Sequence, residues 1–148
     1  MIFGRKQQGV AAVELAFVMI PLILMAFGIT EFGRAIYQYN TLAKSVRDAT
    51  RYLSQQGPGE GGDTARCLAV HGNRACTGSA LAPGLTFAHI QVYDQVSNPS
   101  THLNQPTGSG AINLVTVAIT GYQFTSLVPL VAPNITFGGI SVTMRQVM

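Results

Sequence analysis

A single carboxylate, Glu14, lies inside the most apolar part of the chain. The stretch from Val10 to Ile29 contains no other charged residue, and Pro21 is its other interruption. A helix of about 20 apolar residues is long enough to cross a bilayer. A charged side chain within such a helix costs about 2.5–3.5 kcal/mol on insertion scales. We therefore expect Glu14 to serve a purpose that offsets this cost.

The residues before Glu14 have the layout of a peptidase substrate, in the order RKQQGVAAVE. An enzyme that cuts at the cytoplasmic membrane surface needs a small residue at the scissile bond, because a side chain would obstruct its approach. Gly9 meets this need, and cleavage before Val10 would make Glu14 the fifth residue of the shortened chain. Arg5 and Lys6 would hold the segment at the headgroup boundary by attraction to anionic lipid.

Cleavage would also give Glu14 a partner. It creates a new α-amino group at Val10, opposite in charge to the carboxylate and close to it in depth. In an assembly, the carboxylate of one subunit can pair with the amine of its neighbour. Such a pair offsets the burial cost of both groups and sets the axial register of the subunits.

The charge before the apolar stretch predicts its orientation. Arg5, Lys6 and the free amino terminus favour a cytoplasmic N-terminus and export of everything after the stretch. A secretory signal peptide and an uncleaved signal anchor share this layout and stay as alternatives. The apolar run exceeds the usual h-region of about 7–15 residues, and no small-x-small site follows it cleanly.

Two cysteines, Cys67 and Cys76, lie close in sequence in the part predicted to be exported. We predict a disulfide that closes a short loop in an oxidising compartment. Two free buried thiols are the alternative in a cytosolic domain. Cys67, His71 and Cys76 can also be drawn as metal ligands, but their gaps do not fit a standard zinc pattern and no fourth ligand is evident. We therefore predict no metal.

Other activities lack a signal in the sequence. No Gly-x-Ser-x-Gly, paired-carboxylate site or phosphate loop is present, so we do not expect an enzyme. His89 falls on the outward phase of a predicted strand and is expected at the surface. The net charge of +3 is spread without a run of Lys or Arg, which argues against nucleic-acid binding.

One long helix must position the N-terminal motif. We predict it from Val10 to about Ser54, with residues 10–30 in the membrane and 31–54 amphipathic. Beyond Thr30, a stripe of apolar and small residues predicts a face that packs on a soluble domain and partly on neighbouring subunits. The stripe comprises Phe32, Ile36, Tyr39, Ala43, Val46, Thr50 and Leu53, widened by Ala35, Leu42 and Ala49, and the opposite face carries Arg34, Gln38, Lys44, Asp48 and Arg51.

The rest of the chain predicts one small domain. Pro58 and the surrounding glycines end the long helix, and Asp63 can N-cap a short helix through Val70. Three later segments alternate apolar and polar residues, which predicts strands with one buried face. These segments are 88–93, 115–120 and 140–145, and the stretches 97–110 and 124–133 between them are predicted loops. The fold class is α+β, a long N-terminal helix packed on a small antiparallel sheet.

The chain resembles the TadE-like pseudopilins of the tight-adherence (Flp, type IVb) pilus system. The resemblance lies in GVAAVELAFVMIPLILMAFGITEFGRAIYQYNTLAKSVRDATRYL, from Gly9 to Leu53. Its strongest parts are VELAFVMIPLIL, the EFGRA after Thr30, and the SVRDATRY that ends at Tyr52. A weaker similarity lies in VTVAITGYQFTSLVP, residues 115–129.

This resemblance implies a leader, residues 1–9, removed between Gly9 and Val10 by a prepilin peptidase. It implies a single-pass protein of the bacterial inner membrane with a periplasmic domain, residues 55–148, which becomes extracellular if it enters the pilus. The implied role is that of a minor pilin in pilus assembly or tip priming. The implied partners are the peptidase, other pilins and pseudopilins, the inner-membrane assembly platform and membrane lipid, with no cofactor. The alternative is an unprocessed, signal-anchored periplasmic binding or accessory domain of a secretion system.

Overall fold

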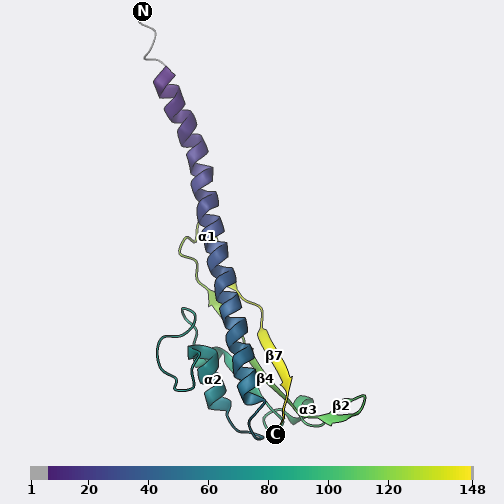
Figure 1. Ribbon diagram of the computed structural model, residues 1–148. Coiled ribbons are helices and arrows are strands. Elements are labelled where there is room, and N and C mark those ends of the chain that lie inside the picture. The colour runs from purple at the N-terminus through teal and green to yellow at the C-terminus, as the bar shows by residue number, and fades with distance from the viewer. Residues whose placement is uncertain (1–6, 148) are drawn as a thin grey trace, which may run out of the picture.

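The computed structural model describes residues 7–147, with side chains from Gly9 onward. One continuous helix, α1 (Gln7–Leu53), forms the spine of the molecule and carries a small domain on its C-terminal half (Figure 1). At about 1.5 Å per residue, α1 is about 70 Å long. Its most apolar window has a mean hydropathy of 2.5 and buries none of its residues against the rest of the chain. By length and composition, this part of α1 is able to cross a membrane.

A three-stranded antiparallel sheet forms the centre of the domain, in the order β1-β4-β7. The strands are β1 (Ile90–Tyr93), β4 (Leu114–Ile119) and β7 (Ile140–Arg145), with Ile90 opposite Ile119 and Val117 opposite Val142. The three predicted strands are therefore present. The first begins two residues later than predicted, because Phe87–His89 forms a 3-10 turn, η1, and the second is shifted by one residue, to 114–119.

The C-terminal half of α1 packs across β4 and β7, and a second helix, α2 (Gly62–His71), packs against α1 and β1. The core between these elements is aliphatic and fully enclosed. It is built mainly from Leu42, Val46, Ala49, Leu53, Val70, Ile90, Val115, Val117, Ile119 and Ile140. Both ends of α2 are set by glycines with positive φ, Gly61 at 75° and Gly72 at 71°. Asp63, predicted as the N-cap, lies instead in the first turn and pairs with Arg66 at 3.3 Å.

The predicted packing face of α1 is correct only in its C-terminal part. Val46, Thr50 and Leu53 are buried as expected, but Phe32 and Ile36 are 59% and 60% exposed. Nearer the membrane-length segment, the predicted Ala35 and Leu42 are buried, but they are joined by Glu31 and Gln38 instead of Phe32 and Ile36. The C-terminal part is covered from two sides, by the sheet and by α2. The part nearer the membrane-length segment is contacted on the Glu31 side by a loop of the domain, and this contact decides which residues are enclosed there.

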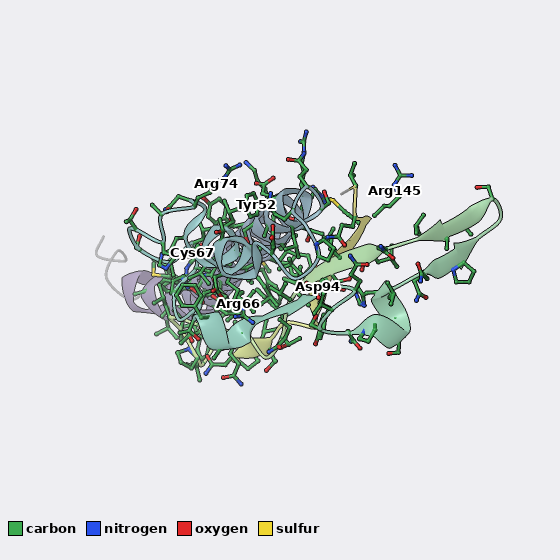
Figure 2. All side chains as sticks on the ribbon, turned by 90° about the horizontal axis from the view of Figure 1, so that it is seen from below. Tyr52, Arg66, Cys67, Arg74, Asp94 and Arg145 are labelled. Atoms are coloured by element: carbon green, nitrogen blue, oxygen red, sulfur yellow. A yellow bond between two sulfur atoms is a disulfide. The ribbon has the colours of Figure 1, made fainter. Side chains whose placement is uncertain are left out.

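Short regular elements lie within and beside the stretches predicted as loops, 97–110 and 124–133. These are α3 (Pro99–His102), the hairpin β2 (Gln105–Thr107) and β3 (Gly110–Ile112), and the pair β5 (Gln123–Phe124) and β6 (Ile135–Thr136). The β2–β3 hairpin projects away from the core (Figure 2). His102 at the end of α3 is buried, and its Nε2 lies 2.9 Å from Oγ1 of Thr116. Strand β4 is therefore buried on both faces, whereas the alternation predicted one.

Asp94 ties the end of β1 to the loop that follows α1. Its Oδ1 accepts the N–H groups of Val96 and Ser97 at 3.0 and 2.7 Å, and its Oδ2 accepts the N–H of Gly59 at 3.1 Å. Burial acts to raise the pKa of Asp94, but these hydrogen bonds outweigh it, so the pKa lies below its ordinary value. The ionised carboxylate thus fixes this end of the domain relative to the spine.

Candidate processing and assembly site

The predicted cleavage site lies on the exposed start of α1. Helix α1 already includes Gly9 and Val10, and a side chain at Gly9 would meet nothing within 4 Å. Val10 is 69% exposed. A peptidase therefore meets no part of the folded domain at this bond. The predicted leader charges, Arg5 and Lys6, lie outside the described residues, and their role stays a prediction.

Glu14 is exposed on the same helix, in an apolar surface formed by Val13, Phe17 and Val18. Val10 and Glu14 are four residues apart on the helix and so lie on the same face. One turn separates them in depth, about 6 Å. The structure therefore brings the predicted new amine and the carboxylate close to the same level, which suits pairing between subunits that are shifted slightly along the axis.

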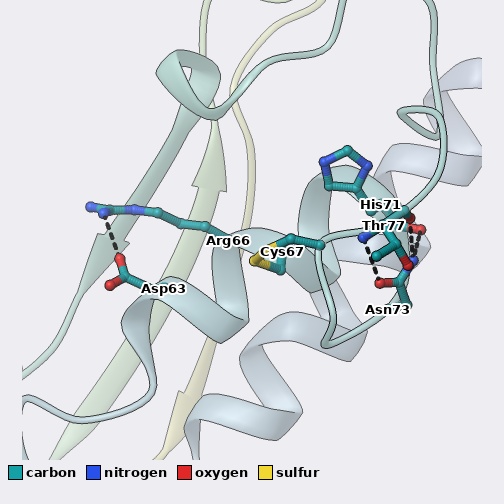
Figure 3. Close-up of a disulfide and its surroundings, with 7 residues drawn as sticks. Asp63, Arg66, Cys67, His71, Asn73 and Thr77 are labelled. Atoms are coloured by element: carbon teal, nitrogen blue, oxygen red, sulfur yellow. Dashed lines mark hydrogen bonds and ion pairs between the residues drawn. A yellow bond between two sulfur atoms is a disulfide. The ribbon is translucent and has the colours of Figure 1, made fainter.

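Cys67 and Cys76 are joined as a disulfide between α2 and the loop after it (Figure 3). Their Cα atoms lie 4.8 Å apart, within the normal range for a disulfide. Asn73 braces the loop, because its side chain donates to the Thr77 carbonyl at 2.7 Å and accepts the Thr77 N–H at 3.2 Å. The loop is thus closed both covalently and by hydrogen bonds.

The rings of His71 and His89 pack against aromatic side chains of the domain. The His71 ring packs against Phe87 with 5.7 Å between centroids. His89 was expected at the surface, but it is half-buried. Its ring accepts the Thr86 N–H at 3.1 Å and packs edge-on against Tyr122. Within residues 7–147, no three His, Cys, Asp or Glu side chains are grouped as metal ligands. Cys67 and Cys76, two of the three side chains drawn as metal ligands, are instead joined to each other in the disulfide.

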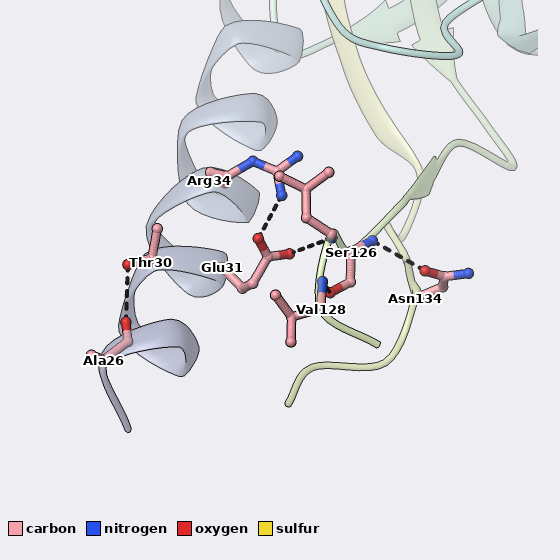
Figure 4. A network of polar contacts seen from close by, with 8 residues as sticks. Ala26, Thr30, Glu31, Arg34, Ser126, Val128 and Asn134 are labelled. Carbon is pink, nitrogen blue, oxygen red and sulfur yellow. Dashed lines mark hydrogen bonds and ion pairs between the residues drawn. The ribbon is translucent and has the colours of Figure 1, made fainter. Parts of the chain in front are cut away.

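Glu31 is the polar residue that the sequence did not single out. Its side chain is only 3% exposed. One carboxylate oxygen accepts from Arg34 at 2.6 Å, and the other accepts the backbone N–H of Leu127 at 3.0 Å (Figure 4). Arg34 in turn lies over the Phe124 ring, with 5.3 Å from its guanidinium carbon to the centroid. Glu31 therefore locks α1 to a loop that begins near residue 125. In the sequence, the i,i+3 spacing of Glu31 and Arg34 could have predicted their ion pair, but not the contact with Leu127.

Tyr122 makes a second buried polar link to the spine. Its hydroxyl lies 2.9 Å from Oε1 of Gln38 and 3.0 Å from the Pro83 carbonyl, so one proton is shared between two acceptors. Burial raises the pKa of the Tyr122 phenol, opposed in part by the charge of Arg34. The phenol therefore stays protonated and donates. Gln38, predicted on the solvent face, is buried because it meets this donor.

Replacing Tyr122 with phenylalanine should destabilise the domain by about 1–3 kcal/mol, because it leaves the buried Gln38 Oε1 without its donor. Urea unfolding of the detergent-solubilised chain, followed by circular dichroism, measures the change. Tyr37→Phe is the matched control, since Tyr37 is 73% exposed and its loss of a hydroxyl should have little effect. Equal stability of the two variants would show that the Tyr122 link contributes nothing.

The spine leaves an apolar surface uncovered beyond the membrane-length stretch. Phe32, Ile36 and Tyr37 are 59%, 60% and 73% exposed on α1, next to the face that the domain covers. Single exposed apolar residues are common on protein surfaces, whereas a group of large ones on one helix is typical of a contact surface. This surface continues the exposed apolar surface of the membrane-length segment toward the domain.

The fold and the site define a class of protein. It is an α+β protein whose one long apolar N-terminal helix suits a single-pass membrane anchor and continues into a small antiparallel domain. Residues 9–51 match the family described as TadE-like protein. This match confirms the resemblance to the TadE-like family of tight-adherence pili, and it suggests a pilus-associated, pilin-like protein. Comparison with curated proteins and with solved structures gives no significant match.

Proposed function

We propose that this protein is a minor pilin, or pseudopilin, that acts in assembly or tip priming of a tight-adherence pilus. The observation that carries the proposal is the family match over residues 9–51. That segment contains the glycine, the new N-terminus and the carboxylate that a pilin needs. It also contains both the membrane-length part and the domain-bearing part of α1. The proposed role is structural rather than catalytic.

Maturation is the first step of the proposed function. A prepilin peptidase cuts between Gly9 and Val10 and releases the leader with Arg5 and Lys6. The exposed position of this bond on α1, far from the domain in Figure 1, supports access by a membrane-embedded enzyme. Until it is cut, the protein stays in the inner membrane with its N-terminus in the cytoplasm and its domain in the periplasm. The Cys67–Cys76 disulfide supports an oxidising compartment for that domain.

Assembly is the second step. The exposed residues of α1 supply a helix–helix contact surface for other pilins and pseudopilins as the subunit leaves lipid for the pilus. Glu14 sets the register through the amine of a neighbouring subunit. Phe32 and Ile36 extend the same contact beyond the bilayer. The inner-membrane assembly platform is the proposed partner that moves the subunit between these states.

Processing separates this proposal from an unprocessed, signal-anchored accessory domain. The full chain is expressed with the active prepilin peptidase and, as the control, with a catalytically inactive one. Intact-mass and N-terminal peptide measurements should find a chain that begins at Val10 only with the active enzyme. An identical N-terminus in both strains would favour the anchored accessory domain and would remove the pilin proposal.

A further inference from the structure

The loop between β5 and β6, residues 125–134, is the part of the domain that reaches furthest along α1 toward its N-terminus (Figure 1). Two contacts fix the position of this loop along α1. The Val131 side chain lies 3.5 Å from the position that a Cβ on Gly28 would occupy. The Leu127 N–H donates to Glu31. Gly28 belongs to the apolar stretch that ends at Ile29, so this loop lies level with the end of the membrane-length segment.

Between residues 127 and 133, the exposed side chains of this loop are all apolar. Leu127 is 73% exposed, and Leu130 is 90% exposed, the highest value among the exposed large apolar residues of the described chain. Pro129 and Pro133 are exposed beside them. No Asp, Glu, Lys or Arg occurs between Asp94 and Arg145, so the loop carries no charge that lipid would reject. In water, the exposed side chains of Leu127 and Leu130 would contribute no burial energy to the fold.

The backbone of the loop is prepared for an apolar environment. A surface loop in water leaves many N–H groups to the solvent, but in lipid each unpaired group costs several kcal/mol. Between residues 126 and 133, the two prolines have no N–H. Every other N–H except that of Leu130 is paired within the protein. The acceptors are Asn134 for Ser126, Glu31 for Leu127, the Ser126 hydroxyl for Val128, and the Val128 carbonyl for Val131 and Ala132.

We propose that residues 127–131 form a second membrane contact, dipping into the lipid leaflet beside α1 while the subunit is anchored. The bilayer is the occupant that the positions favour, because the loop is continuous with the lipid-facing surface of α1 at Gly28. Arg34, which stays paired with Glu31, lies further along α1, and the exposed 31% of its side chain can meet lipid phosphate there. The contact fixes the rotation and height of the domain on the membrane. The inference rests on α1 being the membrane anchor and not on the pilus role.

A fluorescence experiment tests this contact directly, because the chain contains no tryptophan. The full chain carrying Leu130→Trp is reconstituted into phosphatidylcholine vesicles with either ordinary or brominated acyl chains. Two further single-tryptophan variants serve as controls. Phe17→Trp reports the anchor itself, at a residue 75% exposed on the apolar part of α1. Val96→Trp reports the opposite end of the domain, where Val96 packs against Gly59 beyond the end of α1.

We expect brominated lipid to remove most of the emission of the Leu130→Trp and Phe17→Trp variants and to leave that of Val96→Trp unchanged. Quenching of Phe17→Trp without quenching of Leu130→Trp would overturn the loop contact and leave the anchor and the pilus role standing. A blue-shifted but unquenched Leu130→Trp signal would assign the loop to a second protein copy instead of lipid. An unquenched Phe17→Trp would overturn the anchor and the loop contact together.

Discussion

Replacing Gly9 with leucine should abolish removal of the leader, so that the chain keeps its original N-terminus even with an active prepilin peptidase. The reason is steric, because a branched side chain would stand at the bond that the enzyme must approach. The substitution should not harm the protein itself. Nothing lies within 4 Å of the Cβ position at Gly9. Leucine is also a better helix former than glycine by about 0.5–1 kcal/mol. Intact-mass measurement of membrane fractions gives the cleaved share directly.

Gly33→Leu is the matched control for this experiment. Gly33 lies on the same helix and also has nothing within 4 Å of its Cβ position, so the chemical change and the local space are equivalent. This variant should be processed like the parent chain. Normal maturation of Gly9→Leu would place the cleavage elsewhere and would refute the proposed site. Loss of both variants from the membrane would indicate an insertion defect, which flotation of the membrane fraction detects separately.

Replacing Glu14 with leucine should leave processing and insertion intact but nearly eliminate recovery of other pilins with this subunit. The variant removes the proposed partner of the neighbour's new amine and leaves that amine buried alone. Breaking one side of a buried ion pair costs about 3–5 kcal/mol. A loss of that size lowers the association constant by at least about a hundredfold. Cross-linking in membranes followed by affinity purification and quantitative mass spectrometry of the co-purified pilins measures it.

Glu60→Leu provides the control for the charge change, because Glu60 is exposed in the loop after α1 and far from the membrane-length stretch. It should recover pilin partners like the parent chain. Insertion is not a competing explanation for a loss at position 14, because leucine makes the apolar helix easier to insert. Unchanged recovery of partners by Glu14→Leu would remove the pairing argument while leaving the cleavage site untested by this result.

Glu14 and Glu31 show where reasoning from the sequence succeeds and where it stops. Glu14 stands out because its neighbours in sequence are all apolar, which is a local property. Glu31 stands out only in the folded protein. Its carboxylate accepts the N–H of Leu127, 96 residues away, and no pattern around residue 31 identifies that partner. Gln38 is similar, since its burial depends on Tyr122, 84 residues further along.

The N-terminal sequence determined that a helix long enough to cross a membrane is present and that it continues well beyond membrane length. The period-two segments determined the three strands of the central sheet. These features depend on the order of side chains within a few turns or a few strand residues, so they can be read locally. The resemblance to the TadE-like family also rests on such a local run, and the family match over residues 9–51 confirms it.

Only the tertiary structure decided which face of α1 is buried just beyond its membrane-length segment. Two adjacent stripes of the helix have similar spacing, and one carries large apolar residues such as Phe32 and Ile36. The domain nevertheless covers the stripe with Glu31 and Gln38, because the β5–β6 loop and Tyr122 bring hydrogen-bonding partners to that side. A buried polar group is stable only where a partner meets it, and chain topology sets where that partner arrives. The larger apolar residues are left facing outward, and the same topology brings Leu127 and Leu130 to the level where the membrane-length segment ends.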